Sequence, residues 1–346
     1  MFRLSFALVL SVVCLAAVSG TGLADEPAKE FLEALRSRGY YAEALEYLDS
    51  LQGNGAAPAS FQETLPYERG ITLLLGSKRQ KDAAVRAAWL ADGKKSLQKF
   101  VVENKESPLV PQALQQIGNA MVEQARLLMK KSESAAGAVR SELLSESREH
   151  YAKAQSAYES ISKLAGERLK AFPAKVEDPK KADEQQRLRT DLLQALLLAA
   201  ATSEEAAETL EKGSAEQIAA YTGAADRYEK IYKDYRTRMA GLYARMYQAR
   251  CQQKLGKHQE AVVLFDELMK NPDEPDVLRT FKLKVVALAV DSWMEEKQYQ
   301  KILDSVRPLL DSAKDSEEKT PEFLELRVKM ALAAKALAEE QRNEQK

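Results

Sequence analysis

The chain has 346 residues, of which 51 are basic and 52 are acidic, for a formal net charge of −1. This balance excludes binding to nucleic acid or to an anionic membrane surface through bulk positive charge. The sequence has two histidines and two cysteines, too few for a multi-histidine metal site or a disulfide framework.

The first 24 residues have the pattern of a secretory signal peptide. Arg3 provides a short positive start, residues 4–18 are almost wholly apolar, and small residues stand where a signal peptidase would cleave. The apolar run of about 15 residues is shorter than the roughly 20 that a membrane-spanning helix needs. The residue before Cys14 is a valine, not the small residue that a lipoprotein site requires. We therefore predict an exported protein, periplasmic, in the cell envelope or extracellular; the alternative is an uncleaved anchor.

Cleavage would leave residues 25–346, which we predict to be one helical repeat domain. Cys251 is the single cysteine of that part, so no intramolecular disulfide can form and the fold must rest on packing. No later run approaches the length of a membrane span, so none is predicted after cleavage.

The rest of the chain is predicted to be all-α. Good helix formers dominate it, helix breakers separate the periodic segments, and no stretch alternates with the period of a β-strand. The charged segment 174–186, which contains Pro179, is predicted as the longest loop or a fraying helix end. We predict helices at 27–38, 41–52, 64–77, 80–104, 111–133, 138–171, 184–212, 215–236, 239–255, 258–270, 276–296, 299–314 and 321–343.

Five of these helices repeat one stripe of side chains. Its residues are spaced by three, four and three positions, and in most copies a small residue stands second and a bulky one third. Such spacing keeps one helical face turned toward a neighbour. The copies are Tyr41, Ala44, Leu48 and Leu51; Tyr151, Ala154, Tyr158 and Ile161; Tyr221, Ala224, Tyr228 and Ile231; His258, Ala261, Phe265 and Leu268; and Tyr299, Ile302, Val306 and Leu309.

The helix that precedes a stripe has a second pattern. Its clearest example is Leu114, Ile117, Gly118 and Met121, in which a small residue follows two large ones. Two other glycines, at positions 39 and 256, stand two residues before a stripe, where a turn between antiparallel helices is expected.

Together these patterns resemble the tetratricopeptide repeat (TPR) family, whose 34-residue helix pairs have a large-x-x-large-small pattern followed by a small-aromatic one. Units 26–51, 239–270 and 276–314 keep the short turn, whereas the helices between them are longer. The resemblance implies an α-solenoid of stacked antiparallel hairpins with irregular repeat lengths, with a compact helical bundle as the alternative. It also implies a scaffold whose inner face binds a protein or peptide.

The resemblance places candidate partner-binding residues on the first helix of each hairpin. In one of these helices Arg245 stands where the family has an apolar residue. Either the helix packs in a rotated orientation, or Arg245 lies on a functional surface. The candidates are Tyr243, Met246, Arg250, Arg245, Lys284, Asp291 and Met294, with Glu26, Lys29, Glu33 and Arg36 in the first unit.

Nothing in the sequence indicates catalysis. It has no glycine-rich phosphate loop and no G-x-S-x-G turn. We predict His258 and Cys251 to be packing residues, and His150 to lie at the surface. The adjacent Glu204 and Glu205 are predicted to lie on a solvated helix face, where a general acid is not expected. We therefore predict no catalytic, cofactor-binding or metal-binding residue, and no enzyme.

Residues 226–250 are unusually rich in tyrosine and arginine. This composition fits a junction between repeats, a protein- or peptide-binding patch, or, least well, stacking on nucleic-acid bases. Export argues against nucleic acid.

Two functions remain from the sequence. The first is a non-enzymatic scaffold that binds a protein or peptide in the cell envelope. The second is a structural protein whose terminal helices pair with other subunits. Residues 321–343 are predicted to form a last helix without a covering partner, either a cap with a polar outer side or a docking element for self-association.

Overall fold

A computed structural model describes residues 26–53, 59–173, 176–272 and 276–344, so the predicted signal peptide at residues 1–24 lies outside the described residues. The described residues form helices and no strand, as predicted. The helices are α1 (Glu26–Ser37), α2 (Tyr41–Gly53), α3 (Ala59–Ser77), α4 (Ala83–Glu103), α5 (Val110–Ser132), α6 (Gly137–Lys170), α7 (Pro179–Ala207), α8 (Ala215–Tyr235), α9 (Met239–Lys254), α10 (His258–Met269), α11 (Asp276–Glu295), α12 (Tyr299–Asp311) and α13 (Pro321–Glu344).

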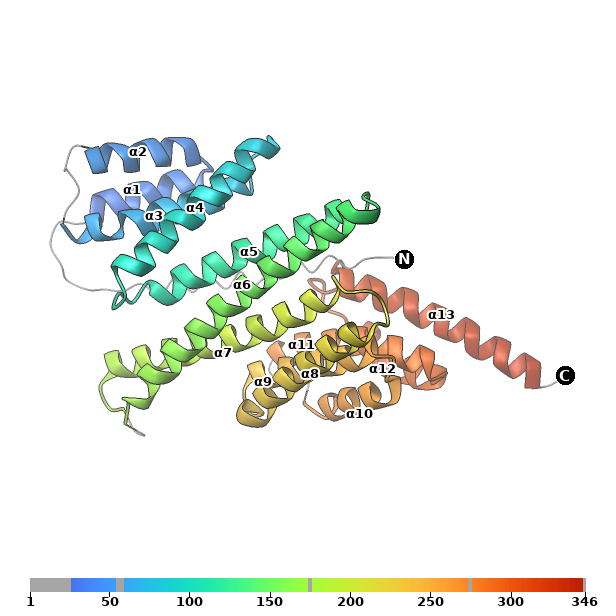
Figure 1. Cartoon of the computed structure of the whole chain (residues 1–346). Coiled ribbons are helices and arrows are strands. Elements are labelled where there is room, and N and C mark those ends of the chain that lie inside the picture. Colours follow the sequence, from blue (N-terminus) through green and yellow to red (C-terminus); the bar gives the residue numbers. More distant parts are fainter. Residues whose placement is uncertain (1–25, 54–58, 174–175, 273–275, 345–346) are drawn as a thin grey trace.

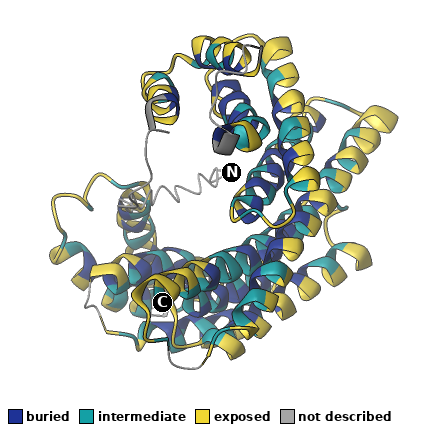
Figure 2. Cartoon of the chain, turned by 90° about the vertical axis from the view of Figure 1, so that its left-hand side faces the viewer, coloured by how far each residue is buried: buried dark blue, intermediate teal, exposed yellow. Residues whose placement is uncertain are grey.

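The helices stack as antiparallel hairpins in two layers. Each helix packs mainly against its neighbours in the chain, and from α3 to α13 each odd-numbered helix also contacts the next odd-numbered one. The odd-numbered helices therefore form one layer and the even-numbered helices the other (Figure 1). Seen from the side, the stack follows a curved path (Figure 2). The predicted α-solenoid of TPR-like hairpins is thus confirmed, and the compact bundle is not observed.

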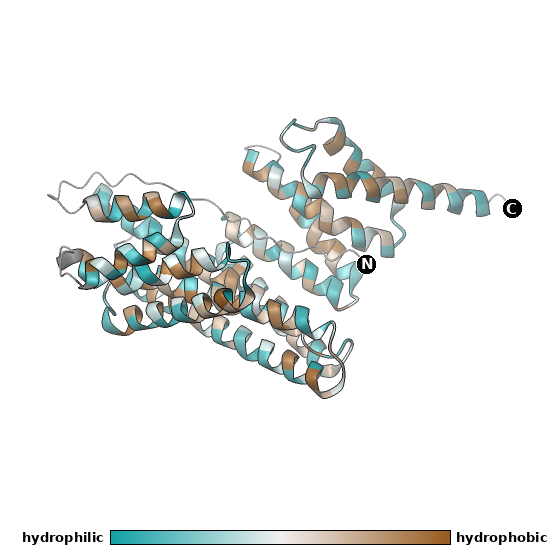
Figure 3. Ribbon diagram, turned by 90° about the horizontal axis from the view of Figure 1, so that it is seen from above, coloured by the Kyte–Doolittle hydropathy of each residue, from teal (hydrophilic) through white to brown (hydrophobic). Residues whose placement is uncertain are grey.

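The core is a chain of small clusters, as a stack of repeats requires. Apolar clusters form successively among α1–α3, α3–α7, α7–α9 and α9–α13. Hydrophobic positions accordingly gather where the helices meet (Figure 3). The stripe residues lie in these clusters. Ala44, Leu48, Tyr151, Ala154, Tyr158, Tyr221, Ala224, Tyr228, Ala261 and Phe265 are buried, and Tyr41 is half-buried.

The structure adds a sixth copy of the stripe, in α4, which the sequence prediction missed. Leu90, Gly93, Leu97 and Phe100 have the same spacing and are all buried. A β-carbon on Gly70 of α3 would lie 2.6 Å from Leu97 Cγ and 3.0 Å from the carbonyl oxygen of Gly93. The absence of side chains at the two glycines therefore lets α3 and α4 approach each other closely.

Helix α7 begins earlier than predicted. The segment predicted as a loop or a fraying helix end supplies its first turns, because Asp178 accepts a hydrogen bond from the backbone N–H of Lys180 and Pro179 occupies the first helical position. Aspartate as N-cap followed by proline is a favourable helix start. This helix start was missed in the sequence because the segment is rich in charged residues.

In three hairpins the turn contains a residue in the left-handed backbone conformation, at the equivalent position in each. Gly39 has φ of +82° and Gly256 has φ of +73°, as the position before each stripe predicts. The equivalent residue before α12 is Lys297, with φ of +54°. All three turns have the same pair of backbone hydrogen bonds, of the Schellman type. Lysine at this position is strained, since a β-carbon disfavours the left-handed region.

We expect Lys297→Gly to raise the free energy of unfolding by about 1 kcal/mol, by relieving this strain. Urea denaturation followed by circular dichroism measures the change. Gly256→Lys, the reverse change at the equivalent turn, should lower stability by a similar amount. A loss of stability in Lys297→Gly would contradict the assignment of strain.

The join between α8 and α9 depends on Gly241. A β-carbon there would lie 2.2 Å from the carbonyl oxygen of Tyr235, a backbone atom that cannot move aside cheaply. We expect Gly241→Ala to destabilise the fold by about 1–3 kcal/mol. Gly223→Ala is the matched control, because a β-carbon at this exposed position in α8 meets nothing within 4 Å. That change should stabilise by about 0.5–1 kcal/mol. Equal effects in thermal melts would refute the close approach.

Candidate partner-binding surface

Tyr243 and Lys284 come together on the layer of odd-numbered helices. The ring of Tyr243, on α9, packs edge-on against Phe281 of α11 with centroids 5.1 Å apart. The same ring stacks on Tyr247 at 6.2 Å, and the Lys284 ammonium lies 5.7 Å from its centroid. Tyr243 and Lys284 are both partly exposed. We call Tyr243, Tyr247, Arg250 and Lys284 the α9–α11 surface.

Arg250 lies at the edge of this surface but is engaged from within. Its guanidinium donates from Nε to Glu204 Oε1 at 2.7 Å and from Nη2 to Glu204 Oε2 at 2.6 Å. The guanidinium also lies 4.5 Å from the centroid of the Tyr247 ring. Only 17 % of the Arg250 side chain is exposed. The contacts of Arg250 therefore join α9 to α7, which makes its role structural.

Glu204 is the centre of a buried network and is 1 % exposed. Besides Arg250, its carboxylate contacts Lys254 Nζ at 3.1 Å and accepts a hydrogen bond from the hydroxyl of Tyr228 at 3.1 Å. The three partners come from α8 and α9, whereas Glu204 itself belongs to α7. A single carboxylate thus binds three consecutive helices together.

Glu204, Arg250 and Lys254 remain charged in this network. Burial alone would raise the pKa of Glu204, but the charges and hydrogen bonds of Arg250 and Lys254 outweigh it and hold the pKa at about 2. Burial works against the charges of Arg250 and Lys254 as well, yet Glu204 raises the pKa of both. The adjacent Cys251 is fully buried, and burial raises the pKa of its thiol. The buried neutral thiol is therefore not an activated nucleophile, and the ionised Glu204 is not a general acid.

The burial of Glu204 corrects the sequence analysis, which placed it on a solvated face. The signal was present, because Leu193, Leu197, Ala200, Glu204 and Ala207 continue one helical stripe. Glu204 occupies a core position of that stripe. By contrast, its neighbour Glu205 is partly exposed and pairs with Arg126 of α5.

Arg245 also faces partners inside the molecule. Its Nε donates to Glu267 Oε2 at 2.9 Å, and its guanidinium lies 4.6 Å from the centroid of the Tyr232 ring. The hydroxyl of Tyr232 donates to the same carboxylate of Glu267. Arg245 therefore bridges α8, α9 and α10. The apolar residues of α9 pack on two sides, toward α7–α8 and toward α10–α11.

Met246 does not belong to the α9–α11 surface. It is 2 % exposed and packs within the core of α9–α13, so its prediction as a partner-binding residue is corrected. Asp291 and Met294 lie two or more turns along α11 from Lys284. Asp291 pairs with Lys329 of α13 at 2.7 Å, and Met294 packs against the same core.

The first unit contributes Arg36 to a further bridge between hairpins. Its Nη1 donates to Glu68 Oε2 at 2.7 Å, and its Nε donates to the hydroxyl of Thr72 at 3.0 Å. Lys29 and Glu33 are exposed, whereas the side chain of Glu26 lies outside the described residues. Arg36 thus stabilises the packing of α1 on α3.

The described residues offer little for catalysis or metal binding. No group of histidine, cysteine and carboxylate side chains among them could hold a metal ion. Asp191 on α7 is the one carboxyl in the described ranges whose pKa is raised, by burial, with Arg187 opposing. No described helix is long and apolar enough to cross a membrane.

Comparisons with known proteins give a distant likeness. No family model matches the chain, and no curated protein matches it. Among solved structures it is similar to the crystal structure of the P58(IPK) TPR domain, with 15 % sequence identity and a TM-score of 0.28. That alignment covers 91 % of this chain and 98 % of the other.

The network around Glu204 makes stability depend on its charge. We expect Glu204→Gln to destabilise by about 3 kcal/mol, because Arg250 and Lys254 lose their buried counter-charge. Glu205→Gln, one residue along, is the matched control and should cost less, about 1 kcal/mol, because the Arg126–Glu205 pair is partly exposed to solvent. Urea denaturation at neutral pH measures both. Equal losses would contradict a special role for Glu204.

The same network predicts an acid dependence. The pKa of Glu204 is lowered on folding, from its ordinary value of 4.5 to about 2. The contribution of Glu204 to the free energy of unfolding is therefore fully present above pH 4.5, and it is lost as the pH falls toward 2. Across that window Glu204→Gln should lose about 3 kcal/mol less stability than the unmodified protein. Parallel pH profiles of the two proteins would refute the lowered pKa.

Proposed function

We propose that the protein is a non-enzymatic scaffold that binds a protein or peptide partner through the α9–α11 surface. The supporting observation is the pair Tyr243 and Lys284. Both are partly exposed, whereas Arg250 is held by a buried ion pair to Glu204 and Arg245 by a partly buried ion pair to Glu267. Tyrosine is among the residues that supply most binding energy at protein interfaces.

The surroundings favour an anchored segment over a deep ligand pocket. Phe281 and Tyr247 hold the Tyr243 ring from two directions, so a partner would meet a rigid aromatic face. The adjacent Lys284 ammonium would attract a carboxylate of the partner. A pre-ordered aromatic anchor beside a charge lowers the conformational entropy lost on binding.

The non-enzymatic part of the proposal rests on the state of the acidic groups. Glu204 is held ionised by its partners. Burial alone would raise the pKa of Glu267, but the hydrogen bonds from Tyr232 and Arg245 and the charge of Arg245 together outweigh burial and lower it. Such carboxylates serve structure better than proton transfer.

A photo-crosslinking amino acid at position 243, in the host cell, should capture a discrete partner. We expect Tyr243→Ala together with Lys284→Glu to weaken binding of the captured partner at least about tenfold, the loss of roughly 1.4 kcal/mol. Tyr40→Ala is the matched control, because Tyr40 is an exposed tyrosine on the turn between α1 and α2. Unchanged affinity in the double variant, or an equal loss in Tyr40→Ala, would reject this surface.

We also propose export to the periplasm or cell envelope, on the pattern of residues 1–24. Mass spectrometry of the protein from its host should find a mature chain that starts near Asp25. Replacing three leucines of the apolar run, Leu4, Leu8 and Leu10, with glutamate should retain the full-length chain in the cytoplasm. Full-length protein outside the inner membrane, or export of the glutamate variant, would contradict a cleaved signal.

A further inference from the structure

Three basic side chains of α4 and α6 gather beside helix α5. The Lys94 ammonium, from α4, lies 4.0 Å from the sulfur of Met121 on α5, and the Nδ1 atom of His150, from α6, lies 3.4 Å from the same sulfur. Lys153 stands one turn along α6 from His150, and its charge acts on both Lys94 and His150. We call Lys94, His150 and Lys153 the α4–α6 basic cluster.

Lys94 is a partly buried cation whose contacts are neutral. Its Nζ donates a hydrogen bond to the Oε1 atom of Gln124 at 2.6 Å, and the sulfur of Met121 is its second contact. No carboxylate among the described residues forms an ion pair with Lys94. Its charge is therefore held away from water without a counter-charge.

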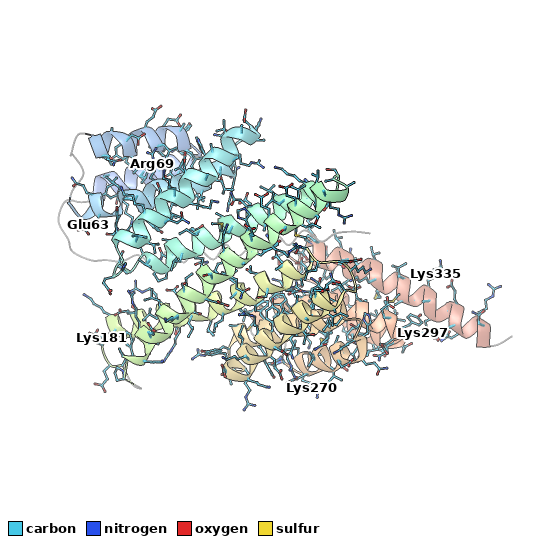
Figure 4. All side chains as sticks on the ribbon, in the orientation of Figure 1. Glu63, Arg69, Lys181, Lys270, Lys297 and Lys335 are labelled. Carbon is cyan, nitrogen blue, oxygen red and sulfur yellow. The ribbon has the colours of Figure 1, made fainter. Side chains whose placement is uncertain are left out.

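Other cations of the chain avoid this situation in one of two ways. Exposed lysines such as Lys181 and Lys270 extend from the stack into solvent (Figure 4). The largely buried Arg36 and Arg250 each bind a glutamate. Lys94 has neither solution. Because removing a charge from water costs free energy, a charge kept this way indicates that something else neutralises it.

Two glutamates lie near the cluster, but they leave Lys94 without a counter-charge. Glu146 Oε1 lies 3.9 Å from His150 Nε2, and Glu149 Oε2 lies 3.9 Å from Lys153 Nζ. Both glutamate side chains are exposed, and solvated pairs of this kind on one helix contribute little. Neither contacts the Lys94 ammonium, which lies across α5 on another helix.

The titration of the cluster agrees with a missing negative charge. Burial lowers the pKa of Lys94, and the charge of Lys153 lowers it further. Burial also lowers the pKa of His150, and the charges of Lys94 and Lys153 act in the same direction. The charges of Glu146 and Glu149 oppose this effect on His150. An anion placed between the basic groups would stabilise the charged form of each.

The donors of the cluster suit a tetrahedral oxyanion better than a carboxylate. Lys94 comes from α4, whereas His150 and Lys153 come from successive turns of α6. Donors from different elements match oxygens that point in different directions, as those of phosphate do, and lysine binds phosphate as a point charge. By contrast, the carboxylates of Glu204 and Glu317 each accept two hydrogen bonds from the fork of one arginine.

We propose that the α4–α6 basic cluster binds a tetrahedral oxyanion of the phosphate type through Lys94, His150 and Lys153. The anion favours the protonated form of His150, whose imidazolium then adds a third positive charge. This site involves other helices than the α9–α11 surface and does not depend on the partner proposed for that surface.

Nuclear magnetic resonance of the two histidine rings tests the site on the unmodified protein. Sulfate serves as the probe, because it is a tetrahedral dianion that does not itself titrate near neutral pH. At constant ionic strength, sulfate should raise the pKa of His150, whereas the signals of His258 should not respond. The chain has no other histidine, so the variant His258→Gln assigns the signals. A His150 titration that sulfate leaves unchanged, or an equal response of both rings, would overturn the site.

Isothermal titration calorimetry with inorganic phosphate at neutral pH measures the contribution of Lys94. We expect Lys94→Met to weaken phosphate binding at least about tenfold, because a charge-assisted hydrogen bond is lost. Lys95→Met is the matched control, since it removes the same charge from an exposed position one residue along α4 and should bind phosphate as the unmodified protein does. Equal weakening in both variants would show attraction by overall charge and would overturn the site.

Acetate in place of phosphate tests the class of ligand. We expect acetate to bind at least about tenfold more weakly, because it has one negative charge and two oxygens in one plane. Acetate that binds as tightly as phosphate would assign the cluster to a carboxylate and overturn the proposed class. Circular dichroism melts check that both lysine variants are folded, and the histidine titration needs no change within the cluster.

Discussion

A carboxylate that is 1 % exposed would ordinarily lose its charge or destabilise its surroundings, because removing an ion from water is expensive. Glu204 does neither, since Arg250, Lys254 and Tyr228 all direct donors at it. These donors belong to the two helices that follow α7. The position of α8 and α9, and of every later hairpin stacked upon them, therefore depends on this one group. Apolar stripes bring the helices together, and directional contacts of this kind select one arrangement among the several that apolar packing permits.

The same arrangement recurs along the stack. Arg36 binds Glu68 between the first and second hairpins, and Arg279 of α11 binds Glu317 before α13. Arginine suits these positions because its planar guanidinium carries several donors: Arg279 donates two hydrogen bonds to the Glu317 carboxylate, and Arg36 donates to the carboxylate and the backbone carbonyl of Glu68 and to Thr72. The consequence for function is that most buried cations are already committed. A partner of the proposed kind would use side chains outside these bridges, such as the Tyr243 ring and the Lys284 ammonium of the α9–α11 surface.

The sequence predicted what local periodicity determines. Helix positions, the all-α class and the stripes follow from a 3.6-residue repeat that any neighbouring helix must satisfy. The copy in α4 was missed because glycine and leucine replace alanine and an aromatic residue there. Glu204 was misplaced because the apolar stripe that leads to its position was not followed along α7. Its partners lie some 24 to 50 residues away, so the local sequence does not identify them. Met246 was misassigned because the resemblance supplies positions but not the rotation of α9, which packs on both sides.

A double-mutant cycle between Glu204 and Arg250 tests most directly whether this pair sets the stacking of α9 on α7. The free energy of unfolding would be measured for the unmodified protein, Glu204→Gln, Arg250→Met and the double variant. The cycle removes the separate contribution of Arg250 against the Tyr247 ring. We expect a coupling free energy of about 2 kcal/mol or more. The double variant should lose less stability than the two single variants lose together. Losses that add within about 0.5 kcal/mol would show that the two groups act independently, and would contradict the account.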